Sequence, residues 1–405
     1  MPTPSQPPEI SLIVNTYMKP RHLSLVLDSI EHQVGIDGRF EVVISDDGST
    51  DDTADLVAKR AATAPFRLAF TTRPHDGFRL SRVRNDGARV ACGARLLFLD
   101  GDCMLPRDHV AIHLERCCKG VATGGDCGRL DERQSDDIDP ATLHAENVAT
   151  LLSTAERKKL QRTLRKWRWY TLIRHPTKPR LVGNNICIHR HDFEQVNGFD
   201  ERFVGWGQED DDITLRLRAA GVRLETILDR TCSLHVWHPT DPTATARWRD
   251  GTNVTYFLRR GRLTRCREGF TKRTPQDLRW HLPEDLPQTA TGRALATLLH
   301  SASPCSDRGA CSGAAEAADR EAEIDVVIRP GTGQFRPRNK TTPQRGPECR
   351  LLLIEGHADA ARSLQKSADV VRRVSQATAE HGETDLDLIA RPLLQELAAV
   401  LEQIG

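Results

Sequence analysis

Carboxylates gather at three points of the chain, in arrangements that could bind a metal ion or move a proton. At the first point, Asp100 and Asp102 flank a glycine directly after an apolar run, so both side chains can face one cation. Such hard oxygen ligands suit Mg²⁺ or Mn²⁺, which keep open positions for substrate phosphates. The same residues also occur as an ordinary Asp-Gly turn with solvated side chains. The metal prediction therefore depends on the other two clusters.

The second cluster is Asp46-Asp47-Gly48-Ser49, which follows another apolar run. It is typical of a turn with a helix cap. Its carboxylates could instead accept a hydrogen bond from the imide N–H of a nucleobase. This second interpretation gains weight because the cluster is predicted to lie at a strand end close to Asp100 and Asp102.

The third cluster, Glu209-Asp210-Asp211-Asp212, follows the tripeptide Gly205-Trp206-Gly207. Acidic residues at a helix start complement the helix dipole, which is one explanation. Two glycines around Trp206 also predict a mobile loop with a flat apolar platform on which a sugar can stack. Carboxylates crowded beside such a platform tend to have raised pKa values, as a general base needs.

Two histidines, His235 and His238, could add ligands to a metal ion. Cys232 nearby suggests a structural zinc site, but the sequence offers no second ligand pair for one. Packed or solvated histidines are another alternative. In the context of the carboxylates, we prefer coordination of the ion held by Asp102.

The elements that must position these residues follow from the hydrophobic pattern. Short apolar runs predict buried strands at 10–14, 40–45, 67–71 and 94–99, and helical stripes lie between them. Strands that alternate with helices predict an α/β fold with a mostly parallel sheet and helices on both faces. Ligands of such sheets bind beyond the carboxyl ends of the strands, where the first two acidic clusters fall.

The composition divides the chain into four parts. Residues 1–8 are a Pro-rich tail that we expect to be disordered, and the α/β domain is predicted over 9–280. Residues 281–349 are rich in small and charged residues, which predicts a flexible linker. Residues 350–405 regain helical periodicity, in 364–374 and 386–404, and are predicted to form a helical extension.

The charge balance narrows the classes of partner. Lys plus Arg number 57 and Asp plus Glu number 56, so we expect no nucleic-acid partner. The chain has an odd count of 11 cysteines and no CxxC pair. Its N-terminus has no cationic segment before an apolar one. Both features predict a cytoplasmic protein.

A basic segment at 156–180 contains Trp167 and Trp169. It suits a solvated helix, a wall for an anionic acceptor, or a peripheral contact at the inner face of a membrane.

Taken together, four segments resemble one enzyme family. "SLIVNTYMKPRHLSLVLDSI", "FEVVISDDGSTDDTADLV", "RVRNDGARVACGARLLFLDGDCMLP" and "GFDERFVGWGQEDDDITLRLRAAG" resemble the inverting family-2 glycosyltransferases of the GT-A fold. The last segment is also similar to the carboxyl-terminal motif of β-1,4-galactosyltransferases and chondroitin-polymerase-like enzymes. The resemblance covers roughly residues 9–275. The first strand departs from the family pattern, because it ends Asn-Thr-Tyr-Met where many members have Thr-Tyr-Asn.

The resemblance implies a role for each matching residue. The positions near the donor nucleotide would be Asn15, Tyr17, Asp46, Asp47, Arg84, Asn85 and Asp100. Asn184 and Asn185 would line the sugar site, and Trp206 would lie on the acceptor side. Glu209 would bind the acceptor, and Asp210 would be the general base. The metal ligands, for Mn²⁺ or Mg²⁺, would be Asp102, His235 and His238.

The sequence thus predicts an inverting, metal-dependent transfer of a sugar from a nucleotide sugar, with UDP the expected nucleotide, to a glycan or glycolipid. One alternative is a nucleotidyltransferase of sugar phosphates, although 15–21 lacks the Gly-rich phosphate loop it would need. The other is an inactive module that binds a glycan or a membrane through Trp206 and the basic segments. The donor sugar, the linkage and the oligomeric state have no signature in the sequence.

Overall fold

The computed structural model describes residues 7–138, 148–239, 251–259, 262–274, 277–278, 280–281, 324–330, 349–355 and 370–374, with Gln395 and Ala399. The chain divides into two compact units. The first comprises Met1–Phe257 with Thr264–Phe270, and the second comprises Leu258–Leu263 with Thr271–Gly405. All of the predicted site residues belong to the first unit.

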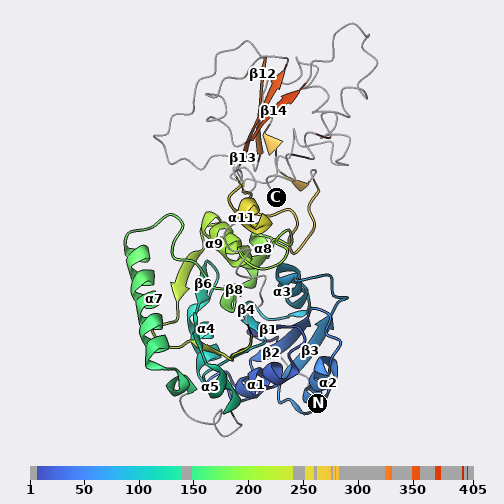
Figure 1. The fold of residues 1–405 in the computed structure, drawn as a ribbon. Helices are drawn as coiled ribbons and strands as arrows, with labels where there is room; N and C mark the ends of the chain where they lie inside the picture. The colour runs from blue at the N-terminus through green and yellow to red at the C-terminus, as the bar shows by residue number, and fades with distance from the viewer. Residues whose placement is uncertain are drawn as a thin grey trace. The chain divides into compact units, whose positions relative to one another are not determined.

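A seven-stranded sheet forms the centre of the first unit, in the order β3-β2-β1-β4-β8-β6-β9 (Figure 1). Its strands are β1 (Ile10–Thr16), β2 (Phe40–Asp46), β3 (Arg67–Thr72), β4 (Arg95–Asp100), β6 (Val121–Gly124), β8 (Asn185–His189) and β9 (Arg223–Thr226). The pairs among β1 to β4 are parallel, and only β8 runs antiparallel to its neighbours. The predicted α/β class and the four predicted strands are confirmed.

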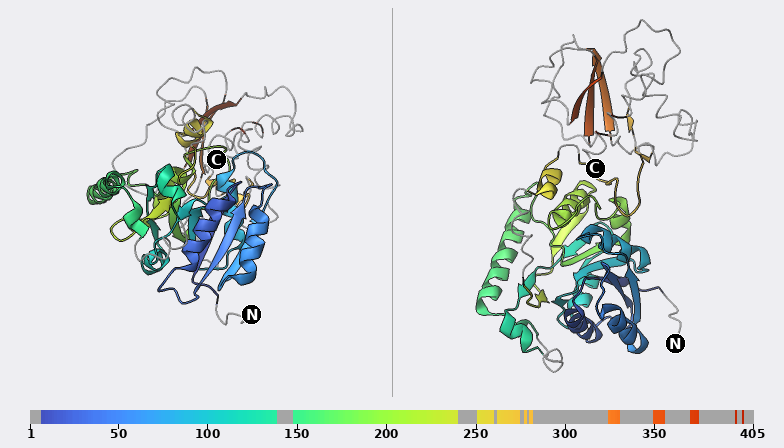
Figure 2. Two further views of the ribbon diagram at one scale, coloured as in Figure 1. Left: turned by 60° about the horizontal axis from the view of Figure 1, so that its bottom comes forward. Right: turned by 45° about the vertical axis from the view of Figure 1, so that its right-hand side comes forward.

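Helices cover both faces of this sheet because successive residues of a strand point to opposite sides. Leu12 and Val14 of β1 join a buried cluster with α1 (Pro20–Glu31), α2 (Thr53–Thr63) and α4 (His109–Arg116). Ile13 joins a second cluster with α3 (Leu80–Val90), α8 (Arg190–Gln195) and α9 (Glu209–Ala219). Figure 1 shows α1 and α2 below the strands and α3 above them, and Figure 2 shows the same arrangement from two other sides.

A small second sheet joins three segments that are far apart in the sequence. It has the order β5-β10-β7, from β5 (Cys103–Met104), β10 (Ser233–His235) and β7 (Cys127–Arg129). In this sheet His235 pairs with Cys103, and the Val236 N–H donates to the Asp102 carbonyl at 2.9 Å. The pairing brings the histidine segment to the residues that follow β4.

Four further elements complete the described part of the first unit. They are α5 (Glu132–Asp136), the short 3-10 helix Val148–Leu151, α7 (Thr154–Leu172) and α11 (Thr252–Phe257). The Ser153 side chain caps α7 by accepting from Glu156 N. No helix within the described ranges is both long enough and apolar enough to cross a lipid bilayer.

The second unit contains a four-stranded parallel sheet, which corrects part of the sequence prediction. Its strands are β11 (Trp280–His281), β12 (Ile324–Pro330), β13 (Cys349–Glu355) and β14 (Val370–Val374). The strand β12 lies within the predicted linker at 281–349, and the helix predicted to end at Val374 is wrong for 370–374. Both strands are rich in β-branched residues, which favour extended backbone once a parallel partner is present.

Two other predictions fall mostly outside the described residues. Of the tail at 1–8, the structure describes Pro7 and Pro8 alone. Of the helix predicted over 386–404, it describes Gln395 and Ala399, and both are helical.

Candidate active site

The site lies at the carboxyl edge of the central sheet, where β1, β2 and β4 end together. Asn15 of β1 is in register with Ser45 on one side and with Asp100 on the other. Its side-chain amide donates to the Asp100 carboxylate at 3.1 Å. The parallel register therefore joins the first and fourth strand ends directly.

The two aspartates after β2 have different environments. The Asp46 carboxylate accepts from Ser49 N at 2.9 Å, from Gly48 N at 3.1 Å and from Thr72 Oγ1 at 2.7 Å. Gly48 has φ +84°, and a Cβ there would meet the Arg73 carbonyl at 2.5 Å. Asp46 therefore shapes the turn, which leaves Asp47 as the carboxylate available to a ligand.

Asp47 has the features of a ligand-binding carboxylate. Its Oδ1 is buried, and no described residue donates a hydrogen bond to it. Burial raises the pKa of Asp47, although His75 and other nearby positive charges oppose the change. A donor N–H from a ligand would satisfy this oxygen.

A flat aromatic surface lies beside Asp47. The Tyr17 and His75 rings stack with centroids 4.3 Å apart and planes inclined by 12°, and Tyr17 is 40% exposed. His75 Nδ1 also lies at hydrogen-bond distance, 2.9 Å, from the backbone carbonyl oxygen of Asp47. The sequence analysis missed His75 because it lies in an irregular loop after β3 without a pattern of its own.

Asp102, His235 and His238 converge, as the resemblance implied. Their ligand atoms all lie within 4.8 Å of one another. His238 Nε2 lies 3.2 Å from Asp102 Oδ2, and His235 Nε2 lies 3.6 Å from Asp102 Oδ1. The Lys19 ammonium, which the sequence analysis did not single out, lies 3.0 Å from the same Oδ2.

The charges around Asp102 keep it ionised. Burial alone would raise the pKa of Asp102, but its hydrogen bond with His238 and the charges of His235 and Lys19 hold the pKa well below its usual range. The hydrogen bond with Asp102 raises the pKa of His238, while burial lowers the pKa of His235. The carboxylate is thus favoured in its ionised form and faces two imidazoles.

These three residues fit a divalent cation. A carboxylate suits Mg²⁺ or Mn²⁺, and imidazole ligands favour the more polarisable transition metals. Cys103 also lies near Asp100 and Asp102, but a hydrogen bond with Cys127 and burial raise the pKa of its thiol well above the usual value. Because the thiolate is the ligand form of cysteine, Cys103 is a poor candidate.

Arg84 joins the two acidic groups of the site. Its Nη2 lies 3.3 Å from Asp100 Oδ1, and its Nη1 lies 3.5 Å from Glu209 Oε1. The side chain is only 1% exposed, donates to the Gly183 carbonyl at 2.9 Å and lies over the Phe199 ring. One guanidinium thus links the end of β4 to the start of α9.

The start of α9 presents two carboxylates in different environments. Burial first, and then the Asp210 charge, raise the pKa of Glu209 to about 7, with Arg84 opposing them. Glu209 Oε2 is buried and accepts no hydrogen bond within the described ranges. Asp210 is half-buried and accepts from Gly183 N at 3.0 Å and from Asp211 N at 2.8 Å.

The loop before α9 is built on left-handed backbone. Gly205, Gly207 and Gln208 have φ of +80°, +97° and +77°. Asn253 of α11 donates to the Gly207 carbonyl at 3.0 Å, and Gly205 N donates to the Phe78 carbonyl at 2.7 Å. Trp206, partly exposed, is therefore held at the edge of the site by α11 and by the loop before α3.

Three of the four predicted asparagines are buried. Asn85 donates to the Phe199 carbonyl at 2.8 Å and to Glu201 at 2.9 Å, so it holds the 199–201 loop. Asn185 Oδ1 contacts the buried His113 and His109 rings at 2.8 and 3.1 Å. Asn184 donates to Cys127 Sγ at 2.9 Å, yet its Oδ1 has no described donor. Asn85 and Asn185 thus position neighbouring elements, while Asn184 Oδ1 and Asn185 Nδ2 are buried without a partner in the described ranges.

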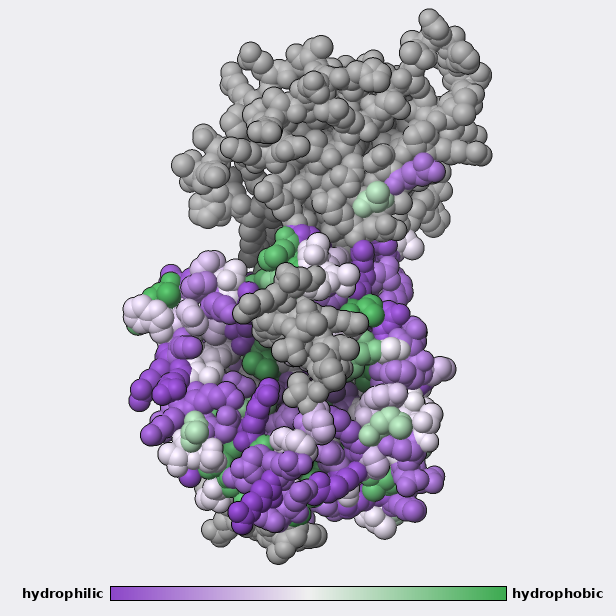
Figure 3. Space-filling view, in the orientation of Figure 1, coloured by the Kyte–Doolittle hydropathy of each residue, from purple (hydrophilic) through white to green (hydrophobic). Residues whose placement is uncertain are grey.

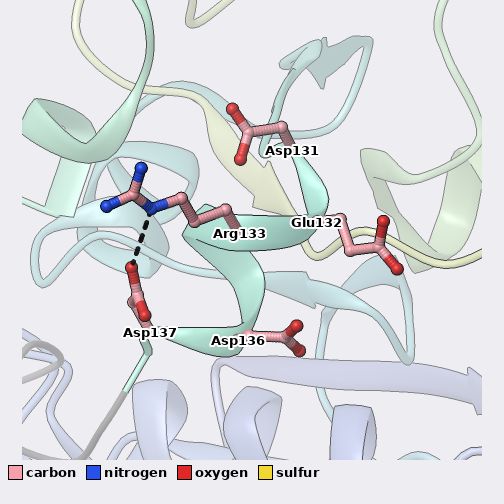
Figure 4. A pocket seen from close by; sticks show the side chains of 5 residues that line it. All are labelled: Asp131, Glu132, Arg133, Asp136 and Asp137. Carbon is pink, nitrogen blue, oxygen red and sulfur yellow. Dashed lines mark ion pairs between the residues drawn. The ribbon is translucent and has the colours of Figure 1, made fainter.

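A hollow on α5 lies outside this constellation (Figure 4). It is lined by Asp131, Glu132, Arg133, Asp136 and Asp137. Arg133 and Asp137 form an exposed ion pair at 3.9 Å. None of the residues predicted for catalysis, nucleotide binding or metal binding lines it.

Two protein-family models match this chain. Residues 11–178 match the family model described as glycosyl transferase family 2, and residues 161–238 match the model described as the N-terminal domain of galactosyltransferase. The chain is therefore similar to glycosyl transferase family 2 over residues 11–178. This region carries the ends of β1, β2 and β4, and the second match extends through the Trp206 loop to His238.

Individual relatives agree with the family. The validoxylamine A glucosyltransferases of Streptomyces hygroscopicus subsp. limoneus and subsp. jinggangensis are each 29% identical over 236 residues, or 54% of this chain. This chain spans about half of their length, 49% and 53%. A mannosyltransferase from Pyrobaculum calidifontis, solved in complex with GDP-Man and Mn²⁺, is 21% identical with a TM-score of 0.42, and the match covers 64% of each chain.

Proposed function

We propose that this protein is an inverting, divalent-metal-dependent glycosyltransferase that moves a sugar from a UDP-sugar to a glycan or glycolipid acceptor. The observation that carries the proposal is the bridge through Arg84, which brings Asp100 and Glu209 into contact with one guanidinium. Asp102 lies beside Asp100, and Asp210 follows Glu209. One small substrate can therefore reach both the candidate metal ligands and the candidate base.

The nucleotide would lie against the ends of β1 and β2. Asp47 Oδ1, buried and without a described donor, suits the imide N–H of uracil. The stacked Tyr17 and His75 rings offer a flat surface beside it. The family match over 11–178 and the similarity to two glucosyltransferases support a nucleotide-sugar donor.

The diphosphate would bind the cation held at Asp102, beside the Lys19 ammonium. Asp102, His235 and His238 would hold the cation, and their donor set favours Mn²⁺ over Mg²⁺. When bound, a divalent ion there offsets the negative charge of a leaving diphosphate. Lys19, with Nζ 3.0 Å from Asp102, adds a second positive charge at the same place.

The acceptor would enter beside Trp206 and meet the start of α9. Asp210 is half-buried and accepts hydrogen bonds from two backbone N–H groups, which fix its direction. As general base it would take the acceptor hydroxyl proton while that oxygen bonds to the anomeric carbon from the face opposite the leaving diphosphate. General base catalysis typically contributes about 10²–10⁴-fold. Glu209, held by Arg84, would orient the acceptor.

The test is a panel of UDP-sugars assayed for hydrolysis and transfer with Mn²⁺ or EDTA. We expect turnover of at least one donor with Mn²⁺ only, and a loss of about 10²-fold or more in Asp210→Asn with donor binding retained. The matched control is Asp211→Asn, which removes the neighbouring carboxylate that pairs with Arg180, and it should keep most of the activity. Turnover of Asp210→Asn near that of the wild type would remove Asp210 from its role.

A further inference from the structure

The helix α7 has two sharply different faces. At 100° per residue, its inner face consists of Leu160, Thr163, Leu164, Trp167 and Tyr170, all partly or fully buried. Trp167 joins the core cluster that contains Leu181 and Leu217. The residues on the opposite half are all exposed, and we call them the outer face: Arg157, Lys158, Arg162, Arg165, Lys166, Arg168, Trp169, Leu172 and the following Ile173.

The outer face carries a concentrated positive charge. Residues 156–180 contain ten Lys or Arg and one acidic residue, in a chain whose net charge is +1. That acid, Glu156, pairs with Lys159 at 3.1 Å. No ion pair joins the six basic residues of the outer face to any residue in the described ranges. Arg168 is near enough to Asp229 to contribute to the lowered pKa of that carboxyl group, and the other five have no such acidic neighbour among the described pKa shifts.

Large apolar side chains lie at one end of this charged face. Trp169 is 58% exposed, Leu172 is 76% exposed and Ile173 is 45% exposed. They follow the basic residues within the last turn of α7, and Figure 3 shows a hydrophobic group above a strongly hydrophilic stretch on the left flank of the unit. Large apolar side chains that are exposed side by side are typical of a surface that binds a partner or a membrane.

We propose that the outer face of α7 binds the surface of an anionic lipid bilayer. The six cations would lie among the anionic headgroups, and Trp169, Leu172 and Ile173 would enter the boundary between headgroups and acyl chains. The helix is about 28 Å long. If it lies flat along the bilayer, the basic residues and the three apolar residues can contact the same surface. This proposal concerns binding alone and does not depend on sugar transfer.

Other partners fit the outer face less well. A second copy of the same face would bring two strongly basic helices together, which repel each other. A nucleic acid or an anionic polysaccharide would pair with the basic residues but would leave the three apolar side chains without a role. The combination of charge with an apolar end therefore favours a lipid surface.

The experiment measures co-sedimentation of the full chain with vesicles of phosphatidylcholine alone or mixed with phosphatidylglycerol. We expect binding to the mixed vesicles and little to pure phosphatidylcholine, with weaker binding as salt rises. Replacing Arg162, Arg165 and Lys166 by Gln should lower the partition constant on the order of 100-fold. Replacing Trp169, Leu172 and Ile173 by Ser should also weaken it, including at high salt where the charge contribution is screened.

The matched control replaces three exposed basic residues elsewhere, Lys59, Lys119 and Arg133, by Gln. It changes net charge equally and should keep the wild-type partition constant. Circular dichroism melting of all variants confirms that each is folded. Equal loss in the control, no binding to mixed vesicles, or binding to heparin or RNA with none to vesicles would overturn the proposal.

Discussion

The buried Glu209 carboxylate should make the protein less stable as the pH rises through neutrality. Burial and the Asp210 charge raise the pKa of Glu209 to about 7 in the folded chain, against an ordinary value of 4.5. The folded state therefore keeps the Glu209 proton over a pH range in which the unfolded chain has released it. The stabilisation is complete below about pH 4.5 and is lost as the pH rises through about 7.

The size of the effect follows from the two pKa values. Their difference corresponds to roughly 3 kcal/mol of unfolding free energy, and the side chain is only 10% exposed, so solvent screens little of it. In Glu209→Gln, which cannot ionise, this loss is absent. Relative to wild type, the variant should gain up to roughly 3 kcal/mol between about pH 5 and about pH 8.

The assay is urea unfolding of both proteins at a series of pH values, with EDTA and without nucleotide. The quantity compared is the difference in unfolding free energy, in which the titration of all distant groups cancels. Glu132→Gln, at an exposed position on α5, is the control and should show no such pH-dependent gain. A Glu209→Gln difference that stays constant across the range would refute the assignment of Glu209 as a buried carboxyl group with a raised pKa.

Three further predictions concern neighbouring parts of the site. His238→Ala should weaken Mn²⁺ binding by more than about tenfold in a calorimetric titration, because it removes one of three converging ligand groups; unchanged affinity would exclude it as a ligand. Asn85→Ala should lower the unfolding free energy by about 2–3 kcal/mol, since buried backbone groups of Phe199 lose their partner, and a loss below about 0.5 kcal/mol would contradict this role. Arg216→Met should cost about 3–5 kcal/mol by urea unfolding, because it leaves the fully buried Asp212 without its 2.6 Å partner; a neutral effect would show that Asp212 is not ionised.

Much of the α/β arrangement could be predicted from the sequence, because its signals are local. Runs such as Ile10–Val14 and Ala94–Leu99 are apolar except for Ser11 and Arg95, and short runs of this kind predict buried strands. The acidic pairs at their ends follow from the same pattern. The strands of the second unit were missed because β13 and β14 are stabilised by pairing between distant segments, which periodicity within one segment does not report.

The roles of individual polar residues depended on long-range contacts that no spacing encodes. Asn85 and Asn185 are of the same type as Asn15 and Asn184, but their amides point at Phe199 and at two buried histidines. Nothing in the sequence distinguishes an amide that binds a ligand from one that binds a loop. Lys19 and His75 were missed for the same reason, because single residues in loops carry no periodic signal.

The central claim is that Asp102 and the two histidines hold a divalent cation which binds a sugar nucleotide at the carboxyl edge of the central sheet. The most direct measurement is calorimetric titration of the full chain with UDP, with and without Mn²⁺, in wild type and Asp102→Asn. We expect wild-type affinity for UDP to rise at least about tenfold with Mn²⁺, and the variant to lose that dependence. Equal affinity for UDP in Mn²⁺ and in EDTA, or a Mn²⁺ dependence that survives Asp102→Asn, would contradict the account.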